Sequence, residues 1–199
     1  GRCLEVDVHL ITASTTAWQN IVTAANRAGI EVPESGTIFE PLASAWSCLT
    51  EDERELGVAL VDIGGGTSEL IVFNQGVVRH SGVIPVGGDH FTNDIAIGLR
   101  TPTPEAEKVK RLWGDRDPAE SSDAPLEVPS VGERPARLVN YSTLTEIIAP
   151  RAQELVELIQ ADLRRMGLEK QLGAGLVLTG GGAKLGGLAA MAEQVMGIP

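Results

Sequence analysis

Continuous apolar runs and helically spaced apolar residues divide the chain into short alternating segments. Runs at 58–63 and 70–73 are typical of buried strands, and glycines lie between them. A further run at 77–86 follows the turn Asn74-Gln75-Gly76, which predicts a three-stranded meander. Apolar residues at helical spacing predict helices that begin near residues 15, 40, 89, 103, 143 and 185. The pattern therefore predicts a mixed α/β fold.

Weaker signals occur in the first fifty residues and in the middle of the chain. Alternation at 6–10 predicts a strand with one apolar face, and 37–39 is expected to form another short strand. The acidic stretch 51–55 is typical of a solvated loop, and so is the polar stretch 115–126. After this loop, the strands expected at 127–131 and 137–141 form a pair.

The longest predicted helix, from about residue 143 to residue 166, has two marked features. Thr143 and Glu146 have the spacing of a capping box at its start. Pro150 lacks the N–H group that a helix interior uses, so it predicts a new segment or a kink. Arg151, which follows, could reach a carboxylate, although solvation at the surface is the default expectation.

A glycine-rich bend lies between the first two predicted strands. Asp62 is near the end of the first strand, and the bend itself contains Gly64, Gly65, Gly66 and Thr67. Glycines let a backbone approach a ligand where a Cβ would collide, and successive N–H groups in such a bend bind anions. Asp62 is placed to hold Mg²⁺ directly or through water. The stretch predicts a phosphate-binding hairpin, although a glycine-rich hairpin without a ligand has the same local pattern.

Two other glycine motifs do not match this bend. A Walker loop needs Gly-Lys-Ser/Thr at the start of a helix, and this triplet is absent from the sequence. A dinucleotide fingerprint needs a helix directly after its glycines, whereas a strand is predicted here.

A second glycine cluster follows the short apolar run at 175–179. Gly180, Gly181, Gly182 and Lys184 lie between this run and a predicted helix. Such a junction presents free N–H groups and the positive end of a helix dipole. Together the two clusters resemble the phosphate and adenosine motifs of the actin/Hsp70/sugar-kinase superfamily. The resemblance implies that these four residues form the floor under adenosine, with the Lys184 stem along the ring.

Segments on either side of the glycine clusters point to one family within this superfamily. Residues 9–13, 49–57, 128–135 and 147–151 resemble segments of the FtsA family of bacterial cell-division proteins, in the family's order. The resemblance implies an actin-like (ribonuclease H-like) ATPase fold. The chain would hold the end of the first lobe and most of the second lobe with a small inserted subdomain. It would be a fragment that lacks the family's N-terminal phosphate loop and C-terminal membrane helix.

The resemblance also implies a division of the chain. Residues 1–50 are expected to form the C-terminal part of the first lobe with the inter-lobe helix. Residues 51–99 would form the first part of the second-lobe core, and 100–142 the small inserted subdomain. The chain would then return to the second-lobe core at 143–199.

Three further sets of residues have roles in the superfamily. Glu107 and Lys110, three apart on one helix face, are expected to hold ribose and base, although an intrahelical ion pair explains the same spacing. Gly87 and Gly88 are expected close to the phosphates, or they form only a tight turn. Glu40 either acts at the hinge between lobes or simply favours the dipole of its helix.

The resemblance implies a cell-division protein that binds ATP and Mg²⁺, polymerises into filaments and tethers FtsZ to the division ring. Its partners would be the FtsZ C-terminal peptide, copies of itself and other divisome proteins, on the cytoplasmic face of the inner membrane at the septum. The membrane would be reached only through the missing C-terminal helix. No nucleophilic triad is evident, so no catalytic residue is assigned and ATP hydrolysis would be slow at most. The alternatives are another actin-like ATPase of the rod-shape, pilus-assembly or chaperone type, and a scaffold that uses no nucleotide.

Charge and composition exclude several other classes of function. A formal net charge of -11 argues against a nucleic-acid partner and against an anionic membrane surface. Cys3 and Cys48 fit neither a metal-site spacing nor a disulfide framework. No apolar run reaches the roughly 20 residues needed to span a bilayer. The chain begins at Gly1 without a signal peptide, as expected of an excised fragment.

Overall fold

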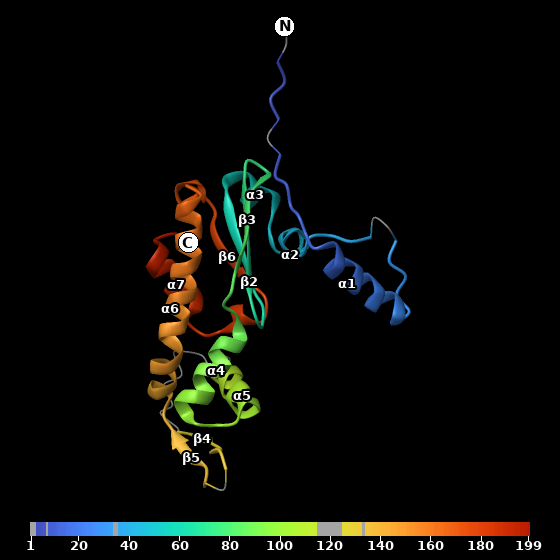
Figure 1. Cartoon of the computed structure of the whole chain (residues 1–199). Helices are drawn as coiled ribbons and strands as arrows, with labels where there is room; N and C mark the ends of the chain where they lie inside the picture. The colour runs from blue at the N-terminus through green and yellow to red at the C-terminus, as the bar shows by residue number, and fades with distance from the viewer. Residues whose placement is uncertain (1–2, 7, 34–35, 115–124, 133) are drawn as a thin grey trace.

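The computed structural model describes residues 3–6, 8–33, 36–114, 125–132 and 134–199 (Figure 1). Its longer helices are α1 (Thr15–Arg27), α2 (Glu40–Cys48), α3 (Glu51–Leu56), α4 (Gly88–Leu99), α5 (Thr103–Gly114), α6 (Tyr141–Arg165) and α7 (Leu188–Met196). Two 3-10 turns are η1 (Glu169–Gln171) and η2 (Gly182–Lys184). Its strands are β1 (Val58–Ile63), β2 (Ser68–Asn74), β3 (Val77–Ile84), β4 (Leu126–Val128), β5 (Arg137–Val139) and β6 (Gly175–Thr179).

The larger sheet has the strand order β3-β2-β1-β6. The strands β1, β2 and β3 pair antiparallel, which confirms the predicted meander, and β6 pairs parallel to β1. Parallel pairing brings the end of β6 beside the end of β1, with Thr179 next to Asp62. Because a glycine turn follows each of these strand ends, the two glycine clusters lie at the same edge of the sheet.

Both faces of the sheet are covered, which explains why β1 is apolar at nearly every position. Alternate residues such as Val61 and Ile63 pack into the main core with α4, α6 and α7. Their neighbours, Val58 and Leu60, pack on the other face against Ala45 and Leu49, which belong to α2 and its C-cap. Figure 1 shows α6 and α7 on one side of the sheet and α2 on the other.

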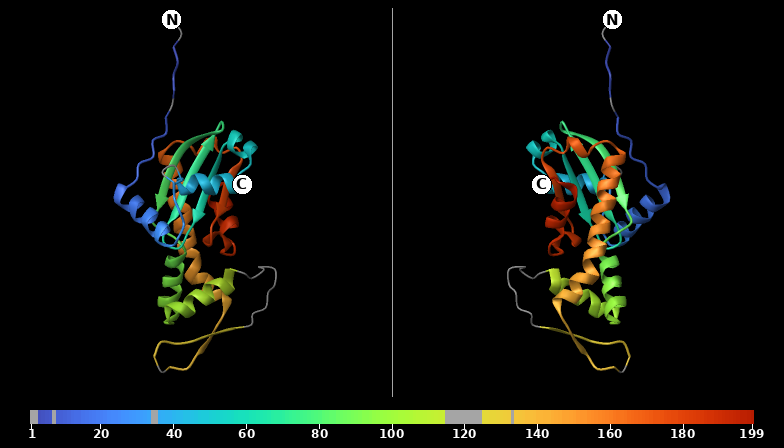
Figure 2. Two further views of the ribbon diagram at one scale, coloured as in Figure 1. Left: turned by 90° about the vertical axis from the view of Figure 1, so that its right-hand side faces the viewer. Right: turned by 90° about the vertical axis from the view of Figure 1, so that its left-hand side faces the viewer.

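A second group of elements extends from the lower edge of the sheet and contains α4, α5, β4 and β5 (Figures 1 and 2). The helix α4 is joined to α6 by an ion pair in which Arg151 Nε and Nη2 lie 2.7 and 3.1 Å from the two Asp94 carboxylate oxygens. At the far end of α4, the Arg137 guanidinium donates to the Leu99 carbonyl. Of the two possibilities for Arg151, the default of surface solvation is wrong and the carboxylate partner is confirmed, on the neighbouring helix α4.

The strands predicted at 6–10 and 37–39 are not formed in the described part of the chain. Residues 3–6 and 8–14 carry no strand, and Val6, Val8 and Leu10 are all exposed. The predicted first helix does form as α1, but none of its residues is buried. Alternation supplies an apolar face but no neighbouring strand, and a strand is stable only when its backbone is paired.

Three local predictions are corrected by the helices. The acidic stretch 51–55 is helical, since Thr50 and Glu53 form the capping box of α3. The predicted box at Thr143 does not exist, because α6 already begins at Tyr141 and Thr143 lies inside it. Pro150 does not begin a new segment, as α6 continues on both sides of it.

The remaining local predictions concern the middle of the chain and the membrane. The strands β4 and β5 are shorter than the segments predicted for them. Of the loop expected at 115–126, residues 115–124 lie outside the described residues, and Leu126 belongs to β4. None of the described helices has both the length and the apolar composition of a bilayer span.

A partly buried hydrogen bond between a histidine and an aspartate fixes α6 against the sheet. His80 Nε2, on β3, lies 2.6 Å from Asp162 Oδ2 on α6, and the Arg165 guanidinium bonds the other carboxylate oxygen. Burial alone would raise the pKa of Asp162, but the hydrogen bonds from Arg165 and His80 outweigh it and hold this pKa below its usual value.

Replacing this carboxylate makes a pH-dependent change in stability testable. A lowered pKa means that the carboxylate stabilises the fold above its unfolded-state pKa of about 3.9 and loses this effect as pH falls. We expect Asp162→Asn to lower the free energy of unfolding by about 1 kcal/mol at neutral pH. In urea titrations the difference from the parent should shrink as pH drops toward about 3. Asp52→Asn, at an exposed position of α3, serves as the control, and a pH-independent difference for Asp162→Asn would contradict this account.

Candidate functional site

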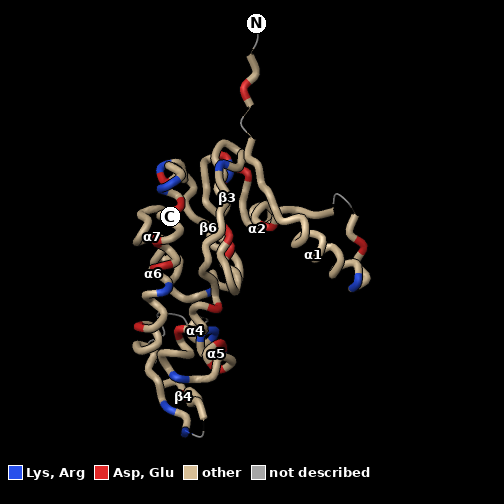
Figure 3. Tube along the Cα trace, viewed as in Figure 1, with Lys and Arg blue, Asp and Glu red and all other residues tan. Residues whose placement is uncertain are grey.

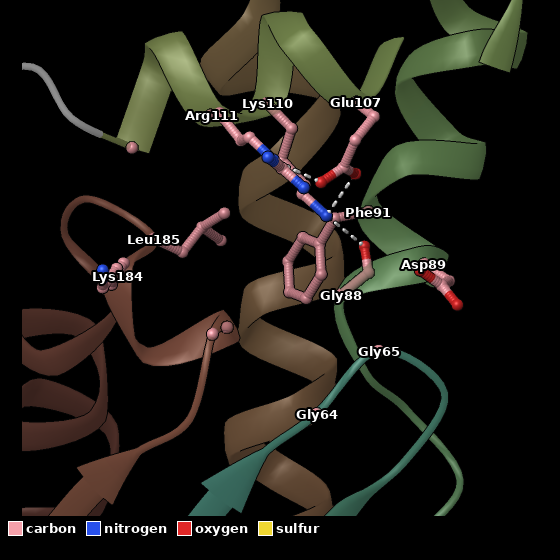
Figure 4. A pocket seen from close by; sticks show the side chains of 13 residues that line it. Gly64, Gly65, Gly88, Asp89, Phe91, Glu107, Lys110, Arg111, Lys184 and Leu185 are labelled. Carbon is pink, nitrogen blue, oxygen red and sulfur yellow. Dashed lines mark hydrogen bonds and ion pairs between the residues drawn. The ribbon is translucent and has the colours of Figure 1, made fainter. Parts of the chain in front are cut away.

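Two glycine turns and one face of α5 surround a cavity of about 520 Å³ (Figure 4). The turns come from the β1–β2 hairpin and from the segment after β6, and the first turn of α4 lies between the hairpin and α5. The lining residues are Gly64, Gly65, Gly88, Asp89, Phe91, Glu107, Lys110, Arg111, Gly114, Gly181, Gly182, Lys184 and Leu185.

The hairpin turn is held by backbone hydrogen bonds on two sides. Within the turn, the Gly64 N–H donates to the Thr67 carbonyl at 2.9 Å. From the first turn of α4, the Gly88 N–H donates to Gly64 O and the Asp89 N–H to Gly65 O, both at 2.8 Å. A Cβ on Gly87 would lie only 2.5 Å from Gly65 O, so this close approach requires glycine.

The second glycine turn packs directly on the end of β1. Gly180 has a φ of +84°, which favours glycine, and a Cβ there would lie 2.4 Å from Asp62 Oδ1. A Cβ on Gly182 would lie 2.2 Å from Ile63 Cγ2. Beside it, a Cβ on Gly181 would meet nothing within 4 Å. Gly180 and Gly182 are therefore needed for packing, whereas Gly181 borders open space at the cavity.

Charged side chains of α5 form the wall opposite the glycine turns. Glu107 Oε2 lies 2.7 Å from Lys110 Nζ, and Glu107 Oε1 lies 2.9 Å from Arg111 Nε. Burial would raise the pKa of Glu107, but hydrogen bonds from Lys110, Thr92 and Arg111 lower it to about 2. Glu107 is therefore ionised throughout the physiological range, and Figure 3 shows acidic and basic residues close together along α5.

Asp62 does not line the cavity. Its Oδ2 accepts a hydrogen bond from Ser44 Oγ of α2 at 2.7 Å. Glu69 stands opposite Asp62 across the hairpin and accepts a hydrogen bond from Thr67 Oγ1 at 2.9 Å. No group of three or more His, Cys, Asp or Glu side chains that could hold a metal ion occurs among the described residues. The carboxylates of Asp62 and Glu69 are too few to surround a metal ion by themselves. They suit Mg²⁺, which keeps most of its ligands as water or phosphate oxygen.

Comparison with known proteins assigns the family. A sequence profile described as "Cell division protein FtsA" matches residues 59–199. The chain belongs to the FtsA family. The FtsA of Pseudomonas aeruginosa is 48% identical over 200 residues, which cover 100% of this chain and 48% of that protein. The FtsA of Escherichia coli K12 is 46% identical over 203 residues, which cover 98% and 48%. The chain thus spans about half the length of the curated relatives it matches, and the predicted family is confirmed.

Solved structures support the actin-like fold. The MreB5 protein of Spiroplasma citri bound to ADP has a TM-score of 0.75 at 19% identity, covering 94% of this chain and 60% of that one. A PilM–PilN complex of type IV pilus biogenesis has a TM-score of 0.67 at 23% identity, covering 92% and 46%. At such identities the likeness concerns the fold alone, and it confirms the predicted actin-like class.

The cavity brings together most, but not all, of the site residues predicted for this FtsA chain. Gly64, Gly65, Glu107, Lys110, Gly181, Gly182 and Lys184 line it. The flanking residues Gly66, Thr67 and Gly180 belong to the same two turns but do not line it, and neither does Asp62. Gly88 lines the cavity and Gly87 supports it. Glu40 is the exposed first residue of α2 and does not line the cavity.

Several lining residues were missed from sequence. Arg111 was missed although it lies four residues after Glu107, a spacing that places both on one helix face. Phe91 had the helical spacing of a core residue, and it is indeed 1% exposed while also bordering the cavity. Asp89 and Leu185 were missed although each directly follows a predicted site residue, Gly88 or Lys184. The sequence held no signal for Gly114, because only tertiary packing brings the end of α5 to the cavity.

The two adjacent glycines at 181 and 182 give a matched test of this packing. Gly182→Ala should lower the free energy of unfolding by about 2 kcal/mol, because its Cβ collides with Ile63. Gly181→Ala should change it by less than about 0.5 kcal/mol, because its Cβ meets open space. Urea unfolding of both variants measures the difference, and equal effects would contradict the packing described here.

Proposed function

We propose that this FtsA chain supplies one wall of an ATP-binding site. The observation that carries the proposal is the meeting of two glycine turns and a charged helix face around one cavity. Exposed backbone N–H groups in glycine turns suit phosphate, and a cavity of this size suits a nucleotide. Two similar MreB5 structures are bound to ADP and to AMPPNP, which supports a nucleotide as the ligand.

Each predicted residue has a role in this proposal. Gly64, Gly65, Gly66 and Thr67 bind the phosphates, and Gly180, Gly181, Gly182 and Lys184 form the floor under adenosine. Glu107 and Lys110 border the ribose and base. Asp62 holds the waters of Mg²⁺, which neutralises phosphate charge when it is bound. Water attack on ATP would be slow with this chain alone, because no general base is assigned to it.

Gly66 provides a sharp test of the phosphate site. A Cβ on Gly66 would meet no protein atom within 4 Å, so Gly66→Ala should fold with unchanged stability. The same Cβ would occupy space that a phosphate needs to reach the backbone. We expect affinity for Mg-ATP, measured by calorimetry, to fall at least about tenfold.

A second pair of variants tests the α5 wall in the same titration. Glu107→Gln should weaken binding, whereas Glu105→Gln removes an equal charge from the same helix at a residue that does not line the cavity. Equal binding by parent, Gly66→Ala and Glu107→Gln would overturn the site. No binding by the parent, even when the remaining half of an FtsA protein is added, would favour a scaffold that uses no nucleotide.

The chain is related throughout its length to cell-division proteins, so we further propose a role in the division ring. In this role the whole protein polymerises on the cytoplasmic face of the inner membrane at the septum and tethers FtsZ there, together with other divisome proteins. The membrane contact would be made by a segment outside this chain. The small subdomain around β4 and β5 would bind the FtsZ C-terminal peptide. Its exposed apolar residues, Val131 and Leu138, support a contact of this kind.

Leu138 allows this partner to be tested. Its side chain is 68% exposed on β5, so Leu138→Ser should leave folding intact while removing apolar contact area. We expect affinity for a labelled FtsZ C-terminal peptide, measured by fluorescence anisotropy, to fall about tenfold. Val83→Ser is the control, because Val83 is 64% exposed on β3 in the main sheet. An equal loss in both variants would argue against the subdomain as the docking site.

A further inference from the structure

The ammonium group of Lys110 is fully used within the protein. Its Nζ lies 2.7 Å from Glu107 Oε2, 2.9 Å from Thr92 Oγ1 and 3.0 Å from the Gly88 carbonyl oxygen. A lysine has three N–H donors, so these three acceptors match its full capacity. Figure 4 shows Nζ turned toward Gly88 and Glu107. A ligand could bond this group only by displacing one of the three partners.

Gly88 is the residue at which the bonds of α5 and of the phosphate-binding turn meet. Its carbonyl accepts from Lys110, and its N–H donates to Gly64 O at 2.8 Å. The next N–H, from Asp89, donates to Gly65 O at 2.8 Å. One peptide segment therefore connects the charged wall of the cavity to the backbone of the glycine turn on the other side.

Thr92 lies at the centre of this network, one helical turn after Gly88. It is 4% exposed and does not line the cavity. Its hydroxyl accepts from Lys110, and its one proton is shared between Glu107 Oε2 at 2.6 Å and the Gly88 carbonyl oxygen at 3.2 Å. A buried hydroxyl that both donates and accepts fixes the positions of the two charged groups at once.

We propose that Thr92 and Lys110 are positioning residues that hold the phosphate-binding turn in shape through Gly88. Lys110 then borders the ligand with its stem, while its charge acts on the protein backbone. This inference rests on the proposed binding of phosphate by Gly64–Thr67. Its consequence is that loss of the network weakens the binding of phosphates rather than of adenosine.

Thr92→Val and Thr92→Ser form a matched pair for testing the network without any ligand. Valine keeps the branched shape but removes the hydroxyl, whereas serine keeps the hydroxyl. Amide hydrogen exchange, followed by NMR in the 199-residue chain, reports the bonds that Gly88 and Asp89 make to the turn. We expect these two amides to exchange about tenfold faster in Thr92→Val and within about twofold of the parent in Thr92→Ser.

Amides in the middle of β1 and β2 report global stability in the same spectra. They should exchange at the parent's rate in both variants. Unchanged exchange at Gly88 and Asp89, or equal acceleration of all amides, would overturn the network's role. If Thr92→Val fails to fold, Lys110→Met removes the ammonium but keeps the stem, and the same selective acceleration is expected.

Ligand binding separates this inference from the proposed function. With ADP and adenosine as probes, Thr92→Val should lower the affinity for ADP about tenfold and that for adenosine by less than about twofold. An equal loss for both probes would overturn the proposal and assign the network to the base instead. If the parent binds neither probe, the proposed ATP site fails in this chain, while the exchange rates still decide whether Thr92 positions the turn.

Discussion

The docking of the first turn of α4 on the β1–β2 turn is the constraint on which the rest of the site depends. Two backbone hydrogen bonds of 2.8 Å join Gly88 and Asp89 to Gly64 and Gly65. They fit only because Gly87 has no Cβ that would strike the Gly65 carbonyl at 2.5 Å. This contact gives the glycine turn one defined shape, which a loop of three glycines would not keep alone because its conformational entropy is high.

Through α4 the same contact is joined to α5, α6 and β5. Asp94 ties the helix to Arg151 of α6, and the Leu99 carbonyl accepts from Arg137 of β5. Lys110 joins its first turn to α5. Bonded residues therefore connect β5, through α4, to the phosphate-binding turn. Such a connection fits a protein that is proposed to combine nucleotide binding with partner binding.

The electrostatics of the cavity differ from those of the chain as a whole. The chain has a formal net charge of -11, yet Lys110, Arg111 and Lys184 border the cavity. Glu107 and Thr92 bond Lys110, so its charge is directed inward, whereas the Arg111 side chain is 74% exposed. Backbone N–H groups, Arg111 and Lys184 are thus the donors that remain for a polyanionic ligand, and the overall acidity does not oppose its binding.

The sequence by itself determined the mixed α/β class, the β1–β2–β3 meander and the two glycine turns, because continuous apolar runs and glycines act locally. The family likewise followed from local motifs. Only the tertiary structure decided that the two turns share an edge, that Asp62 bonds Ser44 of α2 and does not line the cavity, and that Thr92, Glu107 and the Gly88 carbonyl together saturate Lys110. It also decided that 6–10 forms no strand in the described residues and that α6 runs through Pro150, since pairing and packing override local preference.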